Sequence, residues 1–324
     1  KSRVESFSSN ITIHYLDIGK SGNLHHQSIK DLLLYSRKSL KYSKKLISQQ
    51  EFDVTLAFFG IPCGVIAQRL NLPYIISLRG SDVPFHTPKF KWFDRILFRR
   101  LSKFLWHRSA YTVANSIGLK KEALDSAPKQ NFEVIYNGID TDKFRPTNDS
   151  LDNKFKVITT GRLAAHKGSR ILLEACAGIE NLELTFIGDG PMRKELEELS
   201  KSLKVKTIYT GKLEQKDMIP LLQESSVFVL PSLNEGMSNS MLEAMAIGLP
   251  IIATNVGGSH ELIDGNGVIV EKNNIGVIHD QLRNYIKHPD LVRSHGIKSR
   301  ELALNMGWDK MAKEYYNLCK SCVE

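Results

Sequence analysis

The chain has 324 residues, about twice the length of a typical single domain, so we expect two domains. Hydrophobic residues make up 42% and charged residues 24%, a balance that excludes a disordered, collagen-like or fibrous protein. The net charge of +9 comes from residues 1–150, which hold 23 Lys and Arg against 13 Asp and Glu, and this asymmetry indicates an anionic partner.

Three kinds of segment are not expected. No apolar run reaches the roughly 18–20 residues needed to span a bilayer, and the first residues do not resemble a secretory signal. The four cysteines are too few and too scattered for a disulfide framework, which favours a cytoplasmic location. Cys319 and Cys322 have CxxC spacing, but without a second pair we expect no metal or redox site there.

The first half of the chain predicts short strands alternating with helices. A helix is expected near 27–49. The expected strands, which are short apolar runs bounded by polar residues, are Ile11–Tyr15, Val54–Ala57, Tyr74–Ser77, Thr112–Ala114 and Glu133–Ile135.

Residues 89–108 combine basic and apolar side chains. The apolar residues recur at steps of three and four, which predicts a basic amphipathic helix. Such a helix suits an anionic membrane surface, and it also suits packing on its own domain with a solvated basic face. We expect no nucleic-acid partner, because no helix-turn-helix, zinc-finger or RNA-binding pattern accompanies the charge.

The second half alternates more regularly, after a polar stretch at 137–154 that is typical of a linker. The alternation predicts a parallel sheet with helices on both faces, where ligands bind beyond the carboxyl ends of the strands. The expected strands are Lys156–Thr160, Leu182–Ile187, Lys206–Thr210, Val227–Leu230, Pro250–Thr254 and Gly267–Val270, with helices near 168–178, 191–203, 215–224, 239–247 and 308–321.

Two loops that follow strands contain residues suited to a phosphate. In Gly161–Gly168, Arg162 and Lys167 stand next to a helix N-terminus, an arrangement that suits a diphosphate, although both could be solvated surface cations. The glycines of Gly188–Pro191 allow close backbone approach. That loop does not continue as GxGxxG, so no dinucleotide fingerprint is present.

The segment Pro231–Ala246 joins a buried strand to a helix. Backbone amides at 236–239 would form an anion site at the start of that helix. Glu235 would then lie beside the anion, where a carboxylate can accept hydrogen bonds from sugar hydroxyls, and Glu243 would lie two turns along the same side. In the alternative interpretation, Glu235 is a cap residue and Glu243 a surface charge.

These segments resemble retaining glycosyltransferase family 4. Glu235 and Glu243 form its E-x7-E motif, and GRLAAHKG, FIGDGP, YTGKL, EGMSNSMLEAMA and GLPIIATNVGGSHELI follow in the family's order. VANS at 113–116 and EVIYNGIDTDKFRP at 133–146 resemble its closing strand and hinge. The resemblance covers about residues 70–320.

The resemblance implies an α/β fold of the GT-B class, with two Rossmann-like domains whose parallel sheets face a central cleft. Residues 1–145 would bind the acceptor, 146–306 would bind a nucleotide sugar, and 307–324 would form a helix crossing back to the first domain. Arg162, Lys167 and Glu235 would be catalytic. The residues implied to bind the donor are Gly161, Gly188, Gly190, Lys212, Leu213, Glu235, Gly236, Met237, Ser238, Asn239, Leu242 and Glu243.

The implied activity is transfer of a hexosyl or N-acetylhexosaminyl group from a nucleotide diphosphate sugar, with UDP expected, to a glycan or lipid-linked acceptor. Surface-polysaccharide synthesis at the inner face of the cell membrane is the expected setting. No cofactor or metal is implied, since the DxD spacing of Asp140 and Asp142 falls in the hinge motif. A nucleotide-sugar epimerase of the same architecture and a truncated donor-binding pseudoenzyme are the alternatives.

Two features depart from the family pattern. Arg79 replaces the histidine that precedes Gly-x-Asp, while Gly80 and Asp82 are present, and all three are expected on the acceptor side. Arg79 would bind an anionic acceptor or the donor phosphate, or contact Asp82. The sequence also resembles the family only from the tail of its first long helix onward, so we expect the first βα unit to be missing.

Overall fold

The fold is described from a computed structural model, which places residues 2–19, 28–84, 94–147 and 154–324. The chain divides into two compact units, described separately below. Unit 1 contains Lys1–Ala114, Glu122–Glu133 and Asn317–Glu324, and unit 2 contains Asn115–Lys121 and Val134–Tyr316.

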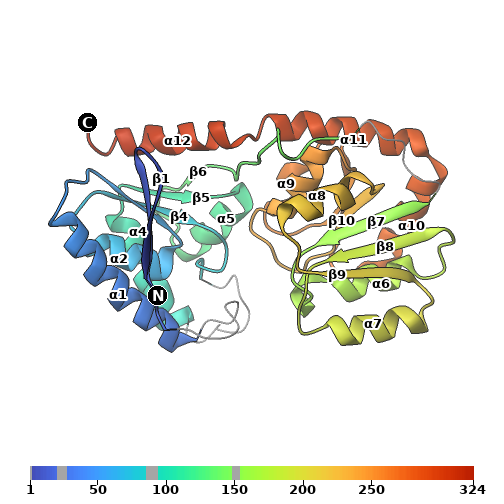
Figure 1. Cartoon of the computed structure of the whole chain (residues 1–324), viewed down its shortest axis with the longest axis horizontal. Coiled ribbons are helices and arrows are strands. Elements are labelled where there is room, and N and C mark those ends of the chain that lie inside the picture. Colours follow the sequence, from blue (N-terminus) through green and yellow to red (C-terminus); the bar gives the residue numbers. More distant parts are fainter. Residues whose placement is uncertain (1, 20–27, 85–93, 148–153) are drawn as a thin grey trace. The chain divides into compact units, whose positions relative to one another are not determined.

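Within the described residues, unit 1 contains a hairpin and a separate four-stranded sheet (Figure 1). Strands β1 (Arg3–Ser8) and β2 (Ile11–Tyr15) pair antiparallel. The sheet has the order β3 (Thr55–Phe58), β4 (Tyr74–Leu78), β5 (Tyr111–Ala114) and β6 (Glu133–Val134), and its first three strands are parallel. The helices are α1 (Ile29–Ile47), α2 (Val65–Gln68), α4 (Arg99–Arg108) and the second half of α5 (Ile117–Ser126), with π-helical turns at Gly60–Gly64 and Asp94–Phe98.

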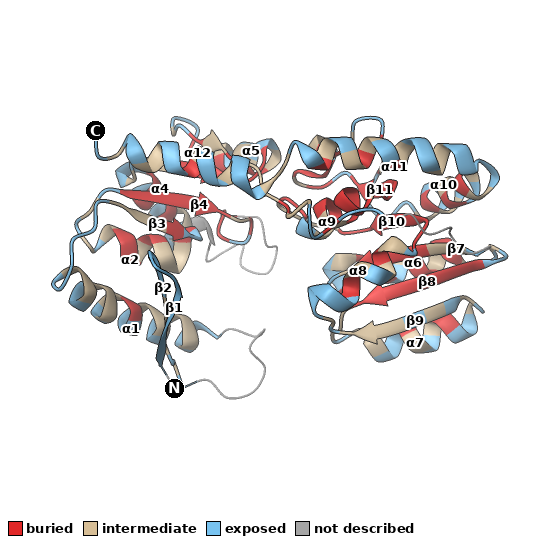
Figure 2. Cartoon of the chain, turned by 45° about the horizontal axis from the view of Figure 1, so that its top comes forward, coloured by how far each residue is buried: buried red, intermediate tan, exposed pale blue. Residues whose placement is uncertain are grey.

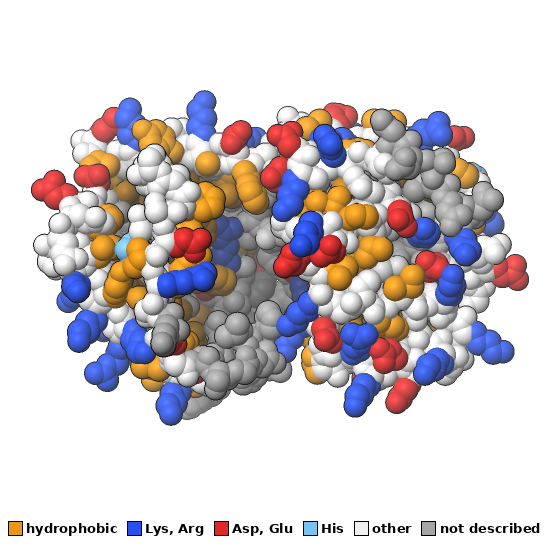
Figure 3. Space-filling model, viewed as in Figure 1, with side chains coloured by type: hydrophobic (Ala, Val, Ile, Leu, Met, Phe, Trp, Pro, Cys, Tyr) orange, Lys and Arg blue, Asp and Glu red, His pale blue; other side chains and the backbone are white. Residues whose placement is uncertain are grey.

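Residues 3–8 form a strand that the sequence did not predict. Every residue of β1 is exposed, and this strand is coloured as exposed in Figure 2. The side chains of Val4 and Phe7 are 60% and 70% exposed, and hydrophobic side chains reach the surface on this part of unit 1 (Figure 3). The hairpin is therefore not part of the core of the parallel sheet.

Unit 2 alternates strands and helices along the chain, as the sequence predicts. The strands are β7 (Phe155–Thr160), β8 (Leu182–Ile187), β9 (Lys206–Gly211), β10 (Val227–Leu230), β11 (Ile251–Thr254) and β12 (Gly267–Val270). The helices are α6 (Ser169–Cys176), α7 (Arg193–Ser202), α8 (Gln215–Gln223), α9 (Asn239–Ile247), α10 (Ile275–Lys287), α11 (Pro289–Leu304) and α12 (Trp308–Lys320), with 3-10 turns at Ala165–Lys167 and Ser259–Leu262.

The central strands of the sheet of unit 2 are buried on both faces because alternate residues enter different cores. Phe228 and Leu230 pack with α8, α9 and α11, while Val227 and Val229 pack with α6, α7 and α10. All four residues are at most 2% exposed, so each contributes roughly 1.5–3 kcal/mol by burial. A continuous apolar run such as that of β10 is therefore typical of a buried parallel strand.

The order of the six described strands is β12-β11-β10-β7-β8-β9. From β7 the chain passes to β8 on one side, and from β10 it passes to β11 on the other. The neighbouring pair β7 and β10 is therefore the point at which the strand order reverses, where open parallel sheets bind ligands beyond the strand ends. The loops that follow these two strands contain Lys167 and Glu235.

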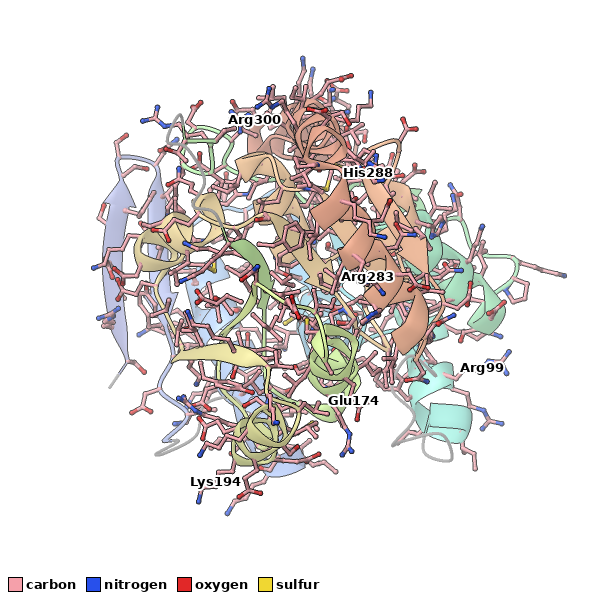
Figure 4. All side chains as sticks on the ribbon, turned by 90° about the vertical axis from the view of Figure 1, so that its right-hand side faces the viewer. Arg99, Glu174, Lys194, Arg283, His288 and Arg300 are labelled. Atoms are coloured by element: carbon pink, nitrogen blue, oxygen red, sulfur yellow. The ribbon has the colours of Figure 1, made fainter. Side chains whose placement is uncertain are left out.

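The segment before β7 is fastened to the helices of unit 2 by Arg300, which lies on α11 and is labelled in Figure 4. Its guanidinium donates hydrogen bonds to the carbonyl oxygens of Thr141, Phe144 and Ala246 at 2.7 to 3.0 Å. Burial lowers the pKa of Arg300 from its ordinary value. The side chain therefore serves as an internal clamp between this segment and α9.

Candidate active site

The loop after β7 lies against the loop after β10 by direct backbone contact. Gly168 has φ +68°, and a Cβ atom at this position would lie 1.9 Å from the carbonyl oxygen of Pro231. The N–H of Leu233 donates to the carbonyl oxygen of His166 at 2.8 Å. Only glycine permits both the conformation and the close approach, so the backbones that present Lys167 and Glu235 are held together.

The loop after β8 is fastened in the same way. A Cβ atom at Gly188, where φ is +137°, would lie 1.9 Å from the carbonyl oxygen of Gly161, and one at Gly190 would lie 2.3 Å from that of Leu163. The N–H of Gly188 also donates to the carbonyl oxygen of Gly211 at 2.8 Å. The glycines predicted to border the donor thus pack the loops after β7, β8 and β9 into one surface.

Lys167 and Glu235 form an ion pair across the two loops. The Lys167 ammonium lies 2.5 Å from Oε1 of Glu235, and the Ser232 hydroxyl donates to the same oxygen at 2.7 Å. The Glu235 side chain is 12% exposed and that of Lys167 is 29% exposed. The structure therefore brings together two of the three residues that the resemblance implied to be catalytic, and it adds Ser232, which sequence analysis missed.

The backbone of Glu235 is fixed from a third direction by the loop after β11. A Cβ atom at Gly257 would lie 1.9 Å from the carbonyl oxygen of Glu235, and the N–H of Gly258 donates to the carbonyl oxygen of Gly236 at 2.8 Å. The adjacent glycines of the GLPIIATNVGGSHELI segment are the signal in the sequence for this contact.

Arg162 differs from Lys167 because its side chain is exposed and forms no ion pair with the residues that the structure describes. It follows Gly161, whose φ of +146° turns the chain just after β7. A solvated guanidinium at this edge can approach an anionic ligand without first breaking an internal contact. The carboxyl-end surface of unit 2 thus offers one paired cation and one exposed cation.

The amides at 236–239 precede α9 and are held by Asn137. Ser238 is the N-cap, and its hydroxyl accepts a hydrogen bond from the N–H of Met241 at 3.3 Å. The Asn137 side chain donates to the carbonyl oxygen of Met237 at 3.3 Å and to Oδ1 of Asn239 at 2.8 Å. Sequence analysis interpreted the segment containing Asn137 as a hinge and did not predict this contact.

Glu243 lies inside α9 and is half-buried. Burial raises the pKa of Glu243 to about 7, although a hydrogen bond with Gln215 and the charge of Lys143 act in the opposite direction. The Lys143 ammonium donates to Oε1 of Gln215 at 2.6 Å. The carboxyl is therefore surrounded by polar groups of Gln215 and Lys143 and is not a solvated surface charge.

The other residues that were predicted to bind the sugar nucleotide lie either on the surface of unit 2 or in its hydrophobic core. Lys212 is exposed after β9, while Leu213 packs against the core beside α8 and α9. Leu242 is completely buried and Met237 is 6% exposed. The resemblance implied that Leu242 binds the donor, and the structure places its side chain inside the core.

Arg79, Gly80 and Asp82 lie in unit 1, beyond the carboxyl end of β4. Asp82 is 3% exposed, and its carboxylate accepts hydrogen bonds from the backbone N–H groups of Gly60, Arg79 and Gly80 at 2.8 to 2.9 Å. Burial raises the pKa of Asp82, which these bonds oppose. Asp82 therefore fastens two loops of unit 1 together, and its expected place on the acceptor side stays a prediction.

Arg79 differs from Asp82 in that its guanidinium lies 4.5 Å above the ring of Phe58, at the end of β3. The Phe58 side chain is 41% exposed. The expected Arg79–Asp82 contact is present, but it is made by the backbone N–H of Arg79. The Arg79 guanidinium and the Phe58 ring thus form a cation–π contact at the carboxyl end of the sheet of unit 1.

The predicted basic helix corresponds to the π-helical turn Asp94–Phe98 and α4, and residues 89–93 lie outside the described part. One face of α4 packs inward, since Leu105 and Trp106 are at most 1% exposed. Residues 96–108, from this turn and α4, also expose three large apolar side chains and three cations. These residues are Ile96, Leu97 and Phe104, which are 50%, 57% and 45% exposed, with Arg100, Lys103 and Arg108.

The described residues contain no group of three or more His, Cys, Asp or Glu side chains that could hold a metal ion. Asp140 instead accepts a hydrogen bond from the N–H of Lys143 at 2.9 Å. In the same parts of the chain, none of the helices combines the length and apolar character required of a membrane span.

The sequence matches two glycosyltransferase families. The family described as Glycosyl transferases group 1 matches residues 140–302, and the family described as Glycosyltransferase Family 4 matches residues 21–143. The first match contains the ion pair of Lys167 with Glu235, the exposed Arg162 and the half-buried Glu243.

Similar proteins agree with these families. An uncharacterized glycosyltransferase of Methanocaldococcus jannaschii is 28% identical, over 85% of this chain and 77% of its own. The UDP-Gal:alpha-D-GlcNAc-diphosphoundecaprenol alpha-1,3-galactosyltransferase of Escherichia coli is 27% identical, over 75% and 68%. The structure of sucrose-phosphate synthase from Thermosynechococcus elongatus has a TM-score of 0.86 at 18% identity, over 98% and 85%. The expected α/β fold of the GT-B class, with two parallel-sheet units, is confirmed.

Proposed function

Because the chain belongs to the glycosyl transferases of group 1, we propose that it moves a hexosyl or N-acetylhexosaminyl group from a UDP-sugar, with retention of anomeric configuration, to a glycan or lipid-linked acceptor in surface-polysaccharide synthesis. The observation that carries the proposal is the convergence of Lys167 and Glu235 at the point where the strand order of unit 2 reverses. The Escherichia coli relative, whose name states a UDP-sugar donor and a diphosphoundecaprenol acceptor, supports the choice of both substrates.

The charges of the site suit departure of a nucleoside diphosphate. When the bond between the anomeric carbon and the phosphate oxygen breaks, negative charge gathers on the diphosphate and positive charge on the sugar ring. Arg162, Lys167 and the amides at 236–239 would stabilise the diphosphate, and such preorganised donors act mainly on the transition state. Glu235 would accept hydrogen bonds from sugar hydroxyls, and Glu243 from the ribose.

The acceptor hydroxyl would attack from the face that the diphosphate leaves. The new bond joins the acceptor oxygen to the anomeric carbon, and the hydroxyl proton passes to a phosphate oxygen of the leaving group. Glu235 is engaged by Lys167 and Ser232, so it is poorly suited to remove this proton. Glu235 and Glu243 are therefore not proposed as the acid and base pair of a glycosidase. Arg79 of unit 1 would contact an anionic part of the acceptor.

We also propose that the exposed side of residues 96–108 holds the protein on an anionic membrane surface at the inner side of the cell membrane. Its apolar residues can enter the interfacial region while Arg100, Lys103 and Arg108 meet lipid phosphates. A lipid-linked acceptor is confined to that surface, so attachment raises its local concentration at the enzyme.

The test is product analysis with a panel of nucleotide sugars, with and without undecaprenyl-diphosphate-linked sugars. Thermal shift first identifies the donor, because a ligand that binds only the folded state raises the unfolding temperature. Transfer of the sugar with its anomeric configuration retained supports the proposal. Altered sugar nucleotide without an acceptor would instead indicate an epimerase, and binding without any turnover would indicate a pseudoenzyme.

A further inference from the structure

The proposed diphosphate requires the ammonium group of Lys167, but this group is already paired with the carboxylate of Glu235. Lys167 and Ser232 both donate to Oε1 of Glu235, and none of the described residues donates to its Oε2. With its side chain only 12% exposed, Glu235 is little hydrated. When a phosphate binds the ammonium of Lys167, the largely buried carboxylate of Glu235 therefore loses one of its two hydrogen-bond donors.

The cost of that loss depends on what the nucleotide brings with it. Removing one partner of a partly buried ion pair is destabilising, because the remaining charge is less well compensated. A sugar on the terminal phosphate supplies hydroxyl donors that can replace the ammonium at Glu235. A free nucleoside diphosphate supplies no such donor, and its own negative charge faces the carboxylate.

We infer that the Lys167–Glu235 ion pair makes this site discriminate in favour of a sugar-bearing nucleotide and against the free nucleoside diphosphate. The inference rests on the proposed function and assigns a specificity role to the coupling between these two residues. Ser232 is the positioning residue, because it holds Glu235 within reach of Lys167.

The same coupling favours release of the leaving group. Once the sugar has moved to the acceptor, its hydroxyls depart with the product and Glu235 again lacks their hydrogen bonds. The carboxylate then competes with the diphosphate for Lys167. Restoring the ion pair weakens the hold on the nucleoside diphosphate, so product inhibition is reduced.

A double-mutant cycle tests the coupling directly. Calorimetry at pH 8 measures the affinities of UDP and UDP-glucose for the wild type, Glu235→Gln, Lys167→Met and the double variant. We expect Glu235→Gln to increase the affinity for UDP about fivefold and to decrease the affinity for UDP-glucose by a similar factor. The ion pair contributes on the order of 1 kcal/mol at this exposure, which corresponds to such a factor. In the Lys167→Met background, Glu235→Gln should change UDP affinity less than twofold.

Two other outcomes would overturn the inference. Equal tightening of UDP by Glu235→Gln in both backgrounds would mean that Glu235 only repels the ligand through space. Unchanged or weakened UDP binding by Glu235→Gln would mean that no competition exists. If neither UDP nor any sugar nucleotide of the panel binds the wild type, the proposed function fails together with the inference.

Two further variants keep the test independent of folding defects. Ser232→Ala removes the second hydrogen-bond donor to Glu235, so it should lower the affinity for UDP more than the affinity for UDP-glucose. An equal loss of affinity for both ligands would contradict the inference. Glu174→Gln is the matched control, because it removes a half-buried carboxylate that pairs with Arg170 on α6, away from Glu235 (Glu174 is labelled in Figure 4). It should change neither affinity, and thermal unfolding verifies that each variant is folded.

Discussion

The side-chain amide of Asn137 donates to Oδ1 of Asn239 at 2.8 Å, although the two residues are 102 positions apart in the chain. The Asn137 side chain is also bonded to the carbonyl oxygen of Met237, and its backbone N–H contacts the sulfur of that residue at 3.2 Å. One asparagine thus orients the turn whose amides precede α9. The affinity of unit 2 for an anion should depend on a residue that does not itself need to touch it.

Asn137→Ala should weaken binding of the sugar nucleotide about tenfold. The substitution removes two hydrogen bonds of about 1 kcal/mol each and frees the turn at 237–239. Calorimetry measures the affinity. Asn131→Ala, at an exposed asparagine, is the control and should have no effect. Equal affinities of the two variants would show that the turn holds its shape without Asn137.

Arg162→Ala should lower kcat/KM for transfer roughly 100-fold, as loss of a preorganised donor to a developing negative charge does. Since Arg162 is exposed, the free energy of unfolding should stay within about 0.5 kcal/mol of the wild-type value. Arg170→Ala is the control, because Arg170 is also exposed but pairs with Glu174 and Glu195. A variant at Arg162 with full turnover would remove this residue from the mechanism.

Glu243→Gln should stabilise the protein at pH 8 and should weaken the binding of the sugar nucleotide. Burial raises the pKa of Glu243 from 4.5 to about 7, so the folded state favours the protonated form. The contribution of Glu243 to stability is therefore most favourable below pH 4.5, and it is lost as the pH rises to about 7. We expect the variant to gain about 2 kcal/mol at pH 8 and little at pH 4.5.

Both consequences of Glu243→Gln can be measured on one preparation. Urea unfolding at the two pH values gives the stability difference, and calorimetry with a UDP-sugar at pH 8 should show about fivefold weaker binding, because the charged hydrogen-bond acceptor is lost. A UDP-sugar is used since it lacks the terminal phosphate ionisation near pH 6 that UDP has. Equal stability gains at both pH values would contradict the burial of an ionised carboxyl.

Asp82→Ala should lower the free energy of unfolding by about 3–5 kcal/mol, because the N–H groups of Gly60, Arg79 and Gly80 lose a buried acceptor. Asp82→Asn should cost less, since it keeps one carbonyl oxygen. Urea unfolding compares the two variants with the wild type. An Asp82→Ala variant of normal stability would mean that the two loops do not depend on this carboxylate.

Reversing charges on α4 should release the protein from anionic vesicles. Phosphatidylcholine vesicles with 30% phosphatidylglycerol, about the anionic content of many membranes, should bind the wild type, with binding that weakens as salt is added. Arg100→Glu with Lys103→Glu should bind at least tenfold less, since each cation near the surface contributes about 1 kcal/mol.

The control for this experiment is Lys194→Glu with Lys204→Glu, which reverses two exposed cations of unit 2 (Lys194 is labelled in Figure 4). Equal losses in both double variants would indicate a response to net charge alone. Indifference of the wild type to lipid charge would dismiss the membrane proposal.

The sequence predicted the strands of unit 2 closely because the central ones are apolar runs buried on both faces. Val227–Leu230, Leu182–Ile187 and Gly267–Val270 have the predicted bounds. Strand β1 was not predicted, since all of Arg3–Ser8 is exposed and leaves no hydrophobic pattern. Hydrophobic periodicity reports burial, so an exposed hairpin does not produce the signal.

The candidate site could be predicted only where a motif marks it. Arg162, Lys167, Glu235 and Glu243 stand in recognisable segments, but the structure was needed to pair Lys167 with Glu235 across 68 positions. The partners that orient them, Ser232 and Asn137, are common polar residues without a distinctive pattern. Their roles come from contacts that form only when the strands are side by side.

The absence of side chains at Gly168, Gly188 and Gly257 has a consequence for the history of this surface. Each of these positions accommodates a carbonyl oxygen where a methyl group would lie only 1.9 Å away. Insertions or deletions in one loop would displace the loops beside it. Changes of sugar preference during evolution are therefore expected to come from exchanges of single side chains at the rim, while the lengths of these turns stay constant.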